Sequence, residues 1–145
     1  MKIKTLRLKL IRIFVKHKLS KKHSETCADY LIRAELLEAK SHGLSRLKMY
    51  CDRLKKKVIN PKPNIKIKKI NSSISHIDAN NSIGFVSANI GISEAITNAK
   101  RSGIGFVGIK KSGHFGLSSF YAEQAVKKNL IVICLTNAPP AIAPF

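Results

Sequence analysis

A glycine-flanked histidine is the strongest candidate for chemistry in this chain. His114 lies in the run SGHFG at 112–116, between a predicted strand over 104–109 and a predicted helix over 117–128. Open α/β sheets bind their ligands in loops at the carboxyl ends of parallel strands. Because an imidazole titrates near neutral pH, His114 can donate or accept a proton in catalysis. The alternative is a loop histidine whose ring bonds only to backbone.

A second polar cluster lies upstream, at a break between two predicted helices. Ser41 and His42 stand at the break, and Arg46 and Tyr50 follow at a spacing of four residues. Side chains four residues apart share one face of a helix, so these groups point one way. A guanidinium matches both oxygens of a carboxylate, which makes Arg46 a candidate ligand for an acidic substrate. The alternative is a solvated helix face that Ser41 caps.

The rest of the chain carries no other catalytic pattern. The acidic residues Asp78, Glu94 and Glu123 are scattered, and we expect no catalytic metal. The 3 cysteines lack metal-ligand spacing, and we expect reduced thiols in a cytoplasmic protein. A G-x-G-x-x-G match at 103–108 falls at the start of and inside a predicted strand, whereas the dinucleotide-binding motif opens a helix. The match therefore does not indicate a Rossmann fold.

The charge of the chain is strongly positive. It contains 27 Lys and Arg against 8 Asp and Glu, for a net charge of +19, and residues 1–69 hold most of that excess. A basic module that binds nucleic acid or another anionic surface is one interpretation. However, Lys greatly outnumbers Arg, Trp is absent, and no aromatic residues alternate with basic ones. We therefore favour compositional drift toward Lys, Ile and Asn as the origin of the charge, and we expect no nucleic acid as partner. No apolar run is long enough for a membrane span.

The elements that position these residues divide into two predicted domains. Residues 1–60 form a basic helical segment, with an amphipathic first helix over 1–19 and further helices over about 21–38 and 44–57. Ser20 is placed to cap the second helix. Proline on both sides of Lys62 separates this segment from the second domain.

Residues 61–145 alternate between strand and helix patterns, which predicts an α/β fold. The expected elements are an edge strand at 65–70, a short strand at 73–78, a turn at 80–82, a helix from Ser87 to Lys100 that Gly103 ends, a strand at 104–109, a helix at 117–128 that Asn129 ends, and a strand at 130–135. The last three elements form a predicted βαβ unit with parallel strands. The fold is thus expected to hold part of a mixed sheet.

Six stretches, taken together in order, resemble a known family. They are SHGxxRxxxY at 41–50, NP at 60–61, DANNSIG at 78–84, GIG at 103–105, GHFG at 113–116 and TNAPPAIAP at 136–144. The chain is similar to the malate/L-lactate dehydrogenases of the second type, which include ureidoglycolate and sulfolactate dehydrogenases and diketogulonate reductase. Nearly the whole chain takes part in the resemblance.

This resemblance implies an oxidoreductase with an α/β fold that is not a Rossmann fold. The implied reaction interconverts a 2-hydroxy acid and a 2-keto acid with NAD or NADP. His114 would be the general acid and base, and Arg46 would hold the carboxylate of a small substrate. Ser41, His42 and Tyr50 would line the substrate site.

The resemblance also bears on the cofactor and on the extent of the chain. Asn137, Ala138 and Pro139 would approach the cofactor, although many members have a serine where Ala138 stands. The family continues beyond the position of Phe145 with a glycine pair and at least as much chain again. We therefore expect an incomplete, amino-terminal fragment of an enzyme that forms a homodimer when complete.

Overall fold

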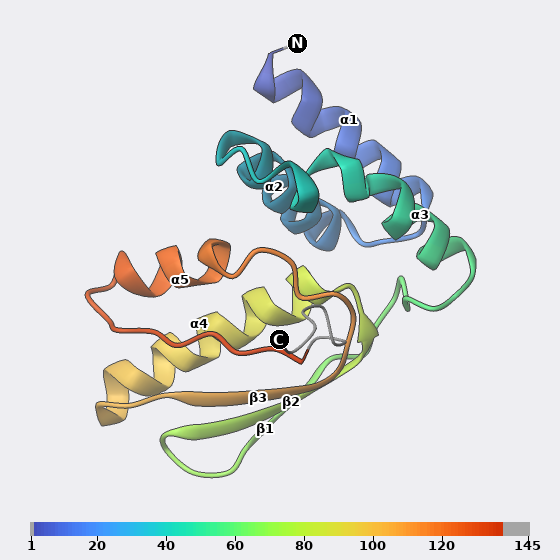
Figure 1. Cartoon of the computed structure of the whole chain (residues 1–145). Helices are drawn as coiled ribbons and strands as arrows, with labels where there is room; N and C mark the ends of the chain where they lie inside the picture. Colours follow the sequence, from blue (N-terminus) through green and yellow to red (C-terminus); the bar gives the residue numbers. More distant parts are fainter. Residues whose placement is uncertain (1, 138–145) are drawn as a thin grey trace, which may run out of the picture.

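The computed structural model describes residues 2–137 and contains an amino-terminal helical group and a small mixed sheet (Figure 1). The helical group comprises α1 (Ile3–Lys16), α2 (Lys21–Leu36), the short 3-10 helices η1 (Lys40–His42) and η2 (Leu44–Arg46), and α3 (Leu47–Lys55). The three predicted amino-terminal helices are thus confirmed, although α3 begins three residues later than expected because η2 occupies that stretch. None of the helices in this described range is long and apolar enough to cross a membrane.

Local signals define the start of α2 and the packing of α1. The Ser20 side chain accepts a hydrogen bond of 3.2 Å from the backbone N–H of His23, which confirms the predicted N-cap. Leu10 and Phe14 are buried on one face of α1, as its amphipathic pattern predicts. This face packs on α2, so the first helix is part of the fold.

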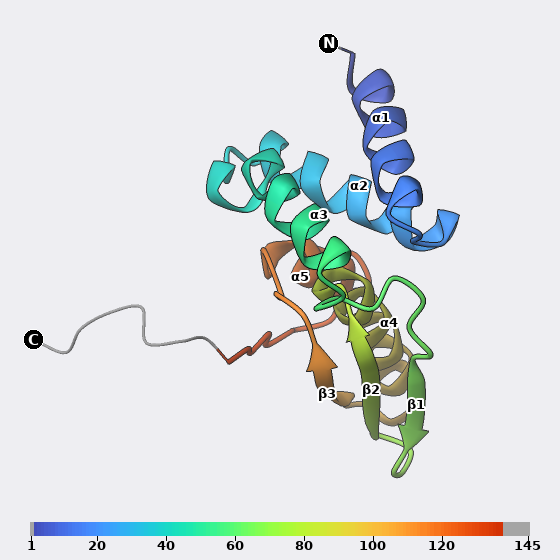
Figure 2. The same ribbon diagram turned by 90° about the vertical axis from the view of Figure 1, so that its right-hand side faces the viewer.

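The sheet has three strands in the order β1, β2, β3 (Figure 2). Strand β1 (Lys66–Lys69) is an edge strand that pairs antiparallel with β2 (Ile74–Ser82). Strand β2 pairs parallel with β3 (Phe106–Ser112), with Ile77 opposite Ile109. Helix α4 (Gly84–Ser102) joins the two parallel strands, and α5 (Ser119–Val126) follows β3. The predicted edge strand and the mixed α/β sheet are confirmed.

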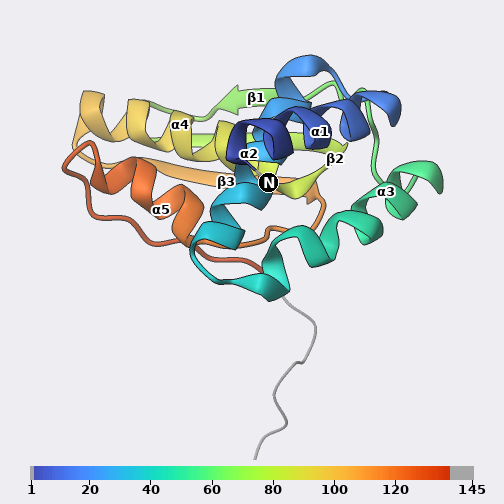
Figure 3. The same cartoon turned by 90° about the horizontal axis from the view of Figure 1, so that it is seen from above.

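The layers place α4 and α5 between the sheet and the helical group (Figures 1 and 2). The views from the side and from above both show α3 beside the end of β2 (Figures 2 and 3). The backbone N–H of Asn60, just after α3, donates to the carbonyl of Asn81 in β2 at 2.8 Å. The helical group is therefore attached at the carboxyl end of the central strand.

The predicted βαβ unit over 104–135 is wrong in its second strand. The parallel partner of β3 is β2, and residues 130–135 form no strand. Exposure still alternates there, with Ile131, Ile133 and Leu135 exposed by 100%, 81% and 83%. Alternation predicts an extended segment with one packed face, but a strand also needs a neighbour with free backbone groups. Strand β3 lies at an edge of the described sheet, but residues 130–135 make no backbone pairing with it.

The predicted turn at 80–82 is also wrong, because these residues belong to β2. Asn80 and Asn81 have φ angles of 50° and 57°, and the pairing with β3 shifts register between Asp78 and Ser82. Asparagine tolerates the left-handed conformation, which occurs both in turns and in β-bulges. The two asparagines alone therefore do not distinguish a turn from a bulge. The feature recognised in the sequence is therefore real backbone irregularity, but it bends a strand.

Helix α4 differs from its prediction at the start and agrees at the end. It begins at Gly84, and the Ser87 hydroxyl donates to the carbonyl of Gly84 at 3.0 Å instead of capping the helix. Gly103 ends it in the left-handed conformation, with φ of 80°. Asn129 has φ of 58° after α5, as predicted for its stop.

Aromatic side chains from both parts of the chain form one core. Tyr30 of α2 stacks on Phe85 of α4 with ring centroids 4.2 Å apart, and Tyr50 of α3 meets Phe85 edge-on at 4.8 Å. All three are fully buried. Phe85 therefore fixes α2 and α3 against the start of α4, while the division into domains at residue 60 stays a prediction.

Candidate functional site

The two polar clusters of the sequence meet in space. The Tyr50 hydroxyl lies 2.9 Å from Nδ1 of His114, a contact between residues 64 positions apart. The ring of His42 lies parallel to that of His114 within 26°, with centroids 6.0 Å apart. The structure thus brings His42, Tyr50 and His114 together at the carboxyl end of β3.

The loop that carries His114 is held by close backbone packing. A Cβ atom on Gly84 would collide with the backbone carbonyl of His114, so only glycine fits at the start of α4. The backbone N–H of Gly113 donates to the carbonyl of Ser82 at 3.0 Å. Gly116 takes a φ of 81°, a conformation that favours glycine. These glycines let the loop lie directly on β2 and α4.

Two buried tyrosines hold the same loop from the other side. The Tyr121 hydroxyl donates to the carbonyl of Phe115 at 2.6 Å. The backbone N–H of Leu117 donates to the Tyr30 hydroxyl. Both tyrosine rings are buried, so their oxygens are fixed in place. The imidazole of His114 is therefore presented by a loop with little freedom to move.

The 3-10 helices position the remaining predicted residues. Ser41 Oγ and His42 Nδ1 are hydrogen-bonded at 2.9 Å, and Arg46 Nε donates to the backbone carbonyl of Ser41 at 2.7 Å. Glu35 accepts a 2.6 Å hydrogen bond from the backbone N–H of Leu44, which ties this stretch to α2. Ser41 and Arg46 are exposed and His42 is half-buried, so a solute can reach this cluster.

Burial and charge act together on the two groups in direct contact. Burial lowers the pKa of His114, and the nearby charges of His42, Arg46 and Arg53 lower it further. Burial raises the pKa of Tyr50 well above its ordinary value. At neutral pH the site therefore pairs a neutral imidazole with a neutral phenol, beside the two guanidinium groups.

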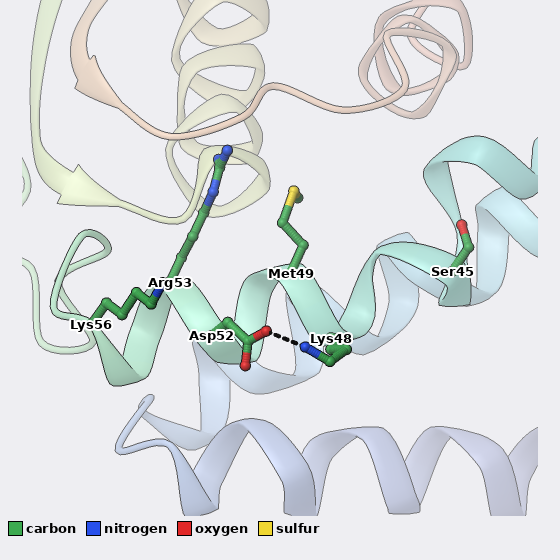
Figure 4. A pocket seen from close by; sticks show the side chains of 6 residues that line it. All are labelled: Ser45, Lys48, Met49, Asp52, Arg53 and Lys56. Carbon is green, nitrogen blue, oxygen red and sulfur yellow. Dashed lines mark hydrogen bonds and ion pairs between the residues drawn. The ribbon is translucent and has the colours of Figure 1, made fainter.

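Arg53 is a further residue of this group, and it was not predicted from the sequence. It follows Tyr50 by three positions within α3, so these two side chains lie on the same face of that helix. Figure 4 shows its side chain extended from α3 toward the start of α4 and the loop after β3. The spacing of three residues from Tyr50 could have pointed to Arg53. The sequence does not show, however, which loop packs opposite α3.

The described residues do not by themselves form a dinucleotide site. Of the three residues predicted to bind the cofactor, Asn137 is described and its side chain is exposed, whereas Ala138 and Pro139 lie outside the described residues. Helix N-termini after strands are common phosphate sites, but Gly84 at the start of α4 is packed against the backbone of His114. One exposed amide is too little to hold such a ligand. Within 2–137, no three His, Cys, Asp or Glu side chains could hold a metal ion.

This arrangement suits proton exchange with a bound anion. The imidazole of His114 is half-buried, and burial together with the charges of His42, Arg46 and Arg53 lowers its pKa. Anions are attracted to such a group of cations, and the imidazole can take or give a proton near neutral pH. The local chemistry therefore matches an acid substrate that carries an exchangeable proton.

Comparison with known proteins identifies the family of this chain. Residues 1–145 match the family model of malate/L-lactate dehydrogenase, and the chain belongs to this family. It is 37% identical over 136 residues to malate/(S)-sulfolactate dehydrogenase of Methanothermus fervidus, covering 94% of this chain and 40% of the relative. It is 31% identical to ureidoglycolate dehydrogenase (NAD(+)) of Escherichia coli K12, covering 88% and 36%.

Solved structures agree with the relatives found by sequence. The sulfolactate dehydrogenase of Methanocaldococcus jannaschii superposes with a TM-score of 0.86 at 31% identity, covering 89% of this chain and 38% of that one. Malate dehydrogenase of Pyrococcus horikoshii gives a TM-score of 0.85 at 30% identity, covering 88% and 37%. The predicted resemblance is thus confirmed, and the family is one of oxidoreductases. The chain spans about 40% of the length of the first of these relatives.

Proposed function

We propose that this chain supplies the substrate-binding and proton-exchanging part of an NAD(P)-dependent dehydrogenase that interconverts a 2-hydroxy acid and a 2-keto acid. The contact between Tyr50 and His114, flanked by His42, carries the proposal. It joins the two polar clusters in one site, and the relatives named above are dehydrogenases of hydroxy acids. By the same likeness we propose a cytoplasmic enzyme that acts as a homodimer.

His114 would exchange the proton of the reaction. Tyr50 occupies Nδ1, so Nε2 is the nitrogen left for the substrate. In oxidation, Nε2 would accept the hydroxyl proton, and in reduction it would return that proton to the keto oxygen. Hydride transfer between the substrate carbon and the nicotinamide is the chemistry that NAD or NADP supplies when bound. The lowered pKa of His114 favours the neutral base, which is the form that oxidation needs.

Arg46 would hold the carboxylate of the substrate. Its Nε is bonded to the carbonyl of Ser41, which orients the guanidinium and leaves its other N–H groups for two carboxylate oxygens. His42 is held by Ser41 beside the His114 ring. A carboxylate on Arg46 would thus place the adjacent hydroxyl-bearing carbon near His114.

A hybrid enzyme tests this proposal. Residues 1–137 of this chain would replace the aligned segment of the Methanocaldococcus jannaschii enzyme, and NADH formation would be followed with 2-hydroxy acids as substrates. Replacing His114 by alanine should reduce turnover at least a hundredfold while cofactor binding is kept. His76→Ala, a change on β2 outside the site, is the matched control. Turnover that survives His114→Ala in a hybrid that binds cofactor would refute the role of His114.

A further inference from the structure

A hydrogen-bond network joins the segment after α3 to the irregular part of β2. We infer that Asn80, at the centre of this network, is a positioning residue that keeps Tyr50 within hydrogen-bond distance of His114. The inference rests on the proposed function, since it gives Asn80 a part in preparing His114 for proton exchange. Within residues 2–137, Asn80 makes no hydrogen bond to Tyr50 or His114, so it acts through the elements that carry them.

The side chain of Asn80 holds the segment that follows α3. Its Oδ1 accepts hydrogen bonds from Nδ2 of Asn60 at 2.9 Å and from the backbone N–H of Asn64 at 3.1 Å. The two residues before Asn60 both donate backbone hydrogen bonds to the carbonyl of Arg53 in α3, at 3.0 and 3.2 Å. Asn60 is therefore fixed to the helix that carries Tyr50, which lies beside the end of β2 (Figure 2).

The backbone of Asn80 lies in the bulge that precedes the His114 loop. After Asp78, β2 advances by four residues to its next pair with β3, while β3 advances by two. Asn80 takes a left-handed φ of 50° there, and its N–H donates to Oδ1 of Asp78 at 3.0 Å. Pairing resumes at Ser82, whose carbonyl accepts a 3.0 Å hydrogen bond from the N–H of Gly113, the residue before His114. The bulge therefore sets where the His114 loop leaves the sheet.

The two roles of Asn80 depend on different properties of one residue. Its backbone needs a residue that tolerates the left-handed conformation, which glycine, asparagine and aspartate all do. Its contact with Asn60 needs a side-chain oxygen, which glycine lacks and aspartate keeps. Asn80→Gly therefore preserves the bulge and breaks the link to α3, whereas Asn80→Asp preserves both.

The ring ¹⁵N shifts of His114 report whether Tyr50 still contacts the imidazole, when they are measured in the 145-residue chain at a pH where the imidazole is neutral. Tyr50→Phe gives the shifts of a ring without that partner. Asn80→Gly should move the shifts about half as far as Tyr50→Phe or further. The two changes combined should move them no further than Tyr50→Phe alone, because the contact is already lost. Asn80→Asp should leave them near their wild-type values.

Asn71→Gly is the matched control for Asn80→Gly. Oδ1 of Asn71 also accepts two hydrogen bonds, from the backbone N–H groups of Ser73 and Ile74 at 2.9 and 2.8 Å, but it lies near the opposite end of β2. The same replacement adds the same freedom to the unfolded chain, so the urea midpoint should fall by a similar amount in both variants. The ring shifts of His114 should stay unchanged in Asn71→Gly.

Asn60→Ala breaks the same side-chain bond from the α3 side. It should move the ring shifts in the same direction, including where Asn80→Gly does not fold. Wild-type shifts in each of these two variants that folds, equal movement in Asn71→Gly, or movement as large in Asn80→Asp would overturn the inference. The shifts are measured without substrate or cofactor, so such a result leaves the proposed function standing, and turnover of the hybrid enzyme tests that function separately.

Discussion

The hydrogen bond between Tyr50 and His114 offers a sharp test of how the site works. Replacing Tyr50 by phenylalanine removes one oxygen and keeps the ring, which is fully buried and meets Phe85 edge-on at 4.8 Å. The loss is then confined to a bond of 2.9 Å between partly buried groups. Such a bond contributes about 0.5–1.5 kcal/mol to the free energy of unfolding.

The same change should alter the tautomer of His114. If Nδ1–H donates to the phenol oxygen, Nε2 keeps the lone pair that a general base needs. Without that partner the proton is no longer held on Nδ1, and the population with hydrogen on Nε2 should rise. Ring ¹⁵N chemical shifts at a pH where the imidazole is neutral measure this population, and urea unfolding measures the stability loss.

Tyr121→Phe is the matched control for Tyr50→Phe. It removes a 2.6 Å hydrogen bond from a buried tyrosine to the carbonyl of Phe115, one residue from His114 in the same loop. We expect a comparable loss of stability and an unchanged His114 tautomer. A tautomer that does not respond to Tyr50→Phe, or that responds equally to Tyr121→Phe, would refute the reasoning.

Three further predictions concern the scaffold and its pH dependence. Gly84→Ala should lower the free energy of unfolding by about 1–3 kcal/mol, because the new Cβ would overlap the carbonyl of His114. Gly108→Ala, where a Cβ meets only ordinary contacts, should lower the free energy of unfolding by less in the same denaturation assay. Equal losses for the two variants would contradict the packing described. Ser20→Ala should cost about 1 kcal/mol through loss of the α2 cap, and an unchanged urea midpoint would count against that cap. Burial and neighbouring cations lower the pKa of His114, so the folded state takes up this proton less readily than the unfolded chain. The free energy of unfolding should therefore fall as the pH drops below about 6.5. His114→Gln should flatten that fall, and an identical pH profile for the variant would exclude the effect.

Local sequence signals predicted the helices well and the strand pairing poorly. Ser20 and Gly103 mark helix ends through their own chemistry, so they could be recognised without the rest of the fold. The segment 130–135 has the alternation of a strand, yet its pairing depends on which backbone lies beside it. Asn80 and Asn81 show the same limit, since their left-handed backbone bends β2 instead of ending it.

The candidate site was predictable in its members more than in its arrangement. The resemblance singled out His42, Tyr50 and His114, but the 2.9 Å contact between the last two depends on Phe85 fixing α3 against α4. Arg53 was not predicted, because its place in the site depends on the loop opposite α3, which lies far away in sequence. Packing between distant segments thus decides which polar residues belong to one site.

Titration of His114 with and without a bound acid tests the central claim most directly. In the free chain the pKa of His114 should lie below its ordinary value, because burial and the neighbouring cations disfavour the imidazolium. Saturation with L-lactate should raise that pKa, since a carboxylate on Arg46 offsets part of the positive charge. A pKa of His114 that is unchanged at saturating acid, with bound lactate perturbing other residues instead, would contradict the assignment of His114 as the proton-exchanging group.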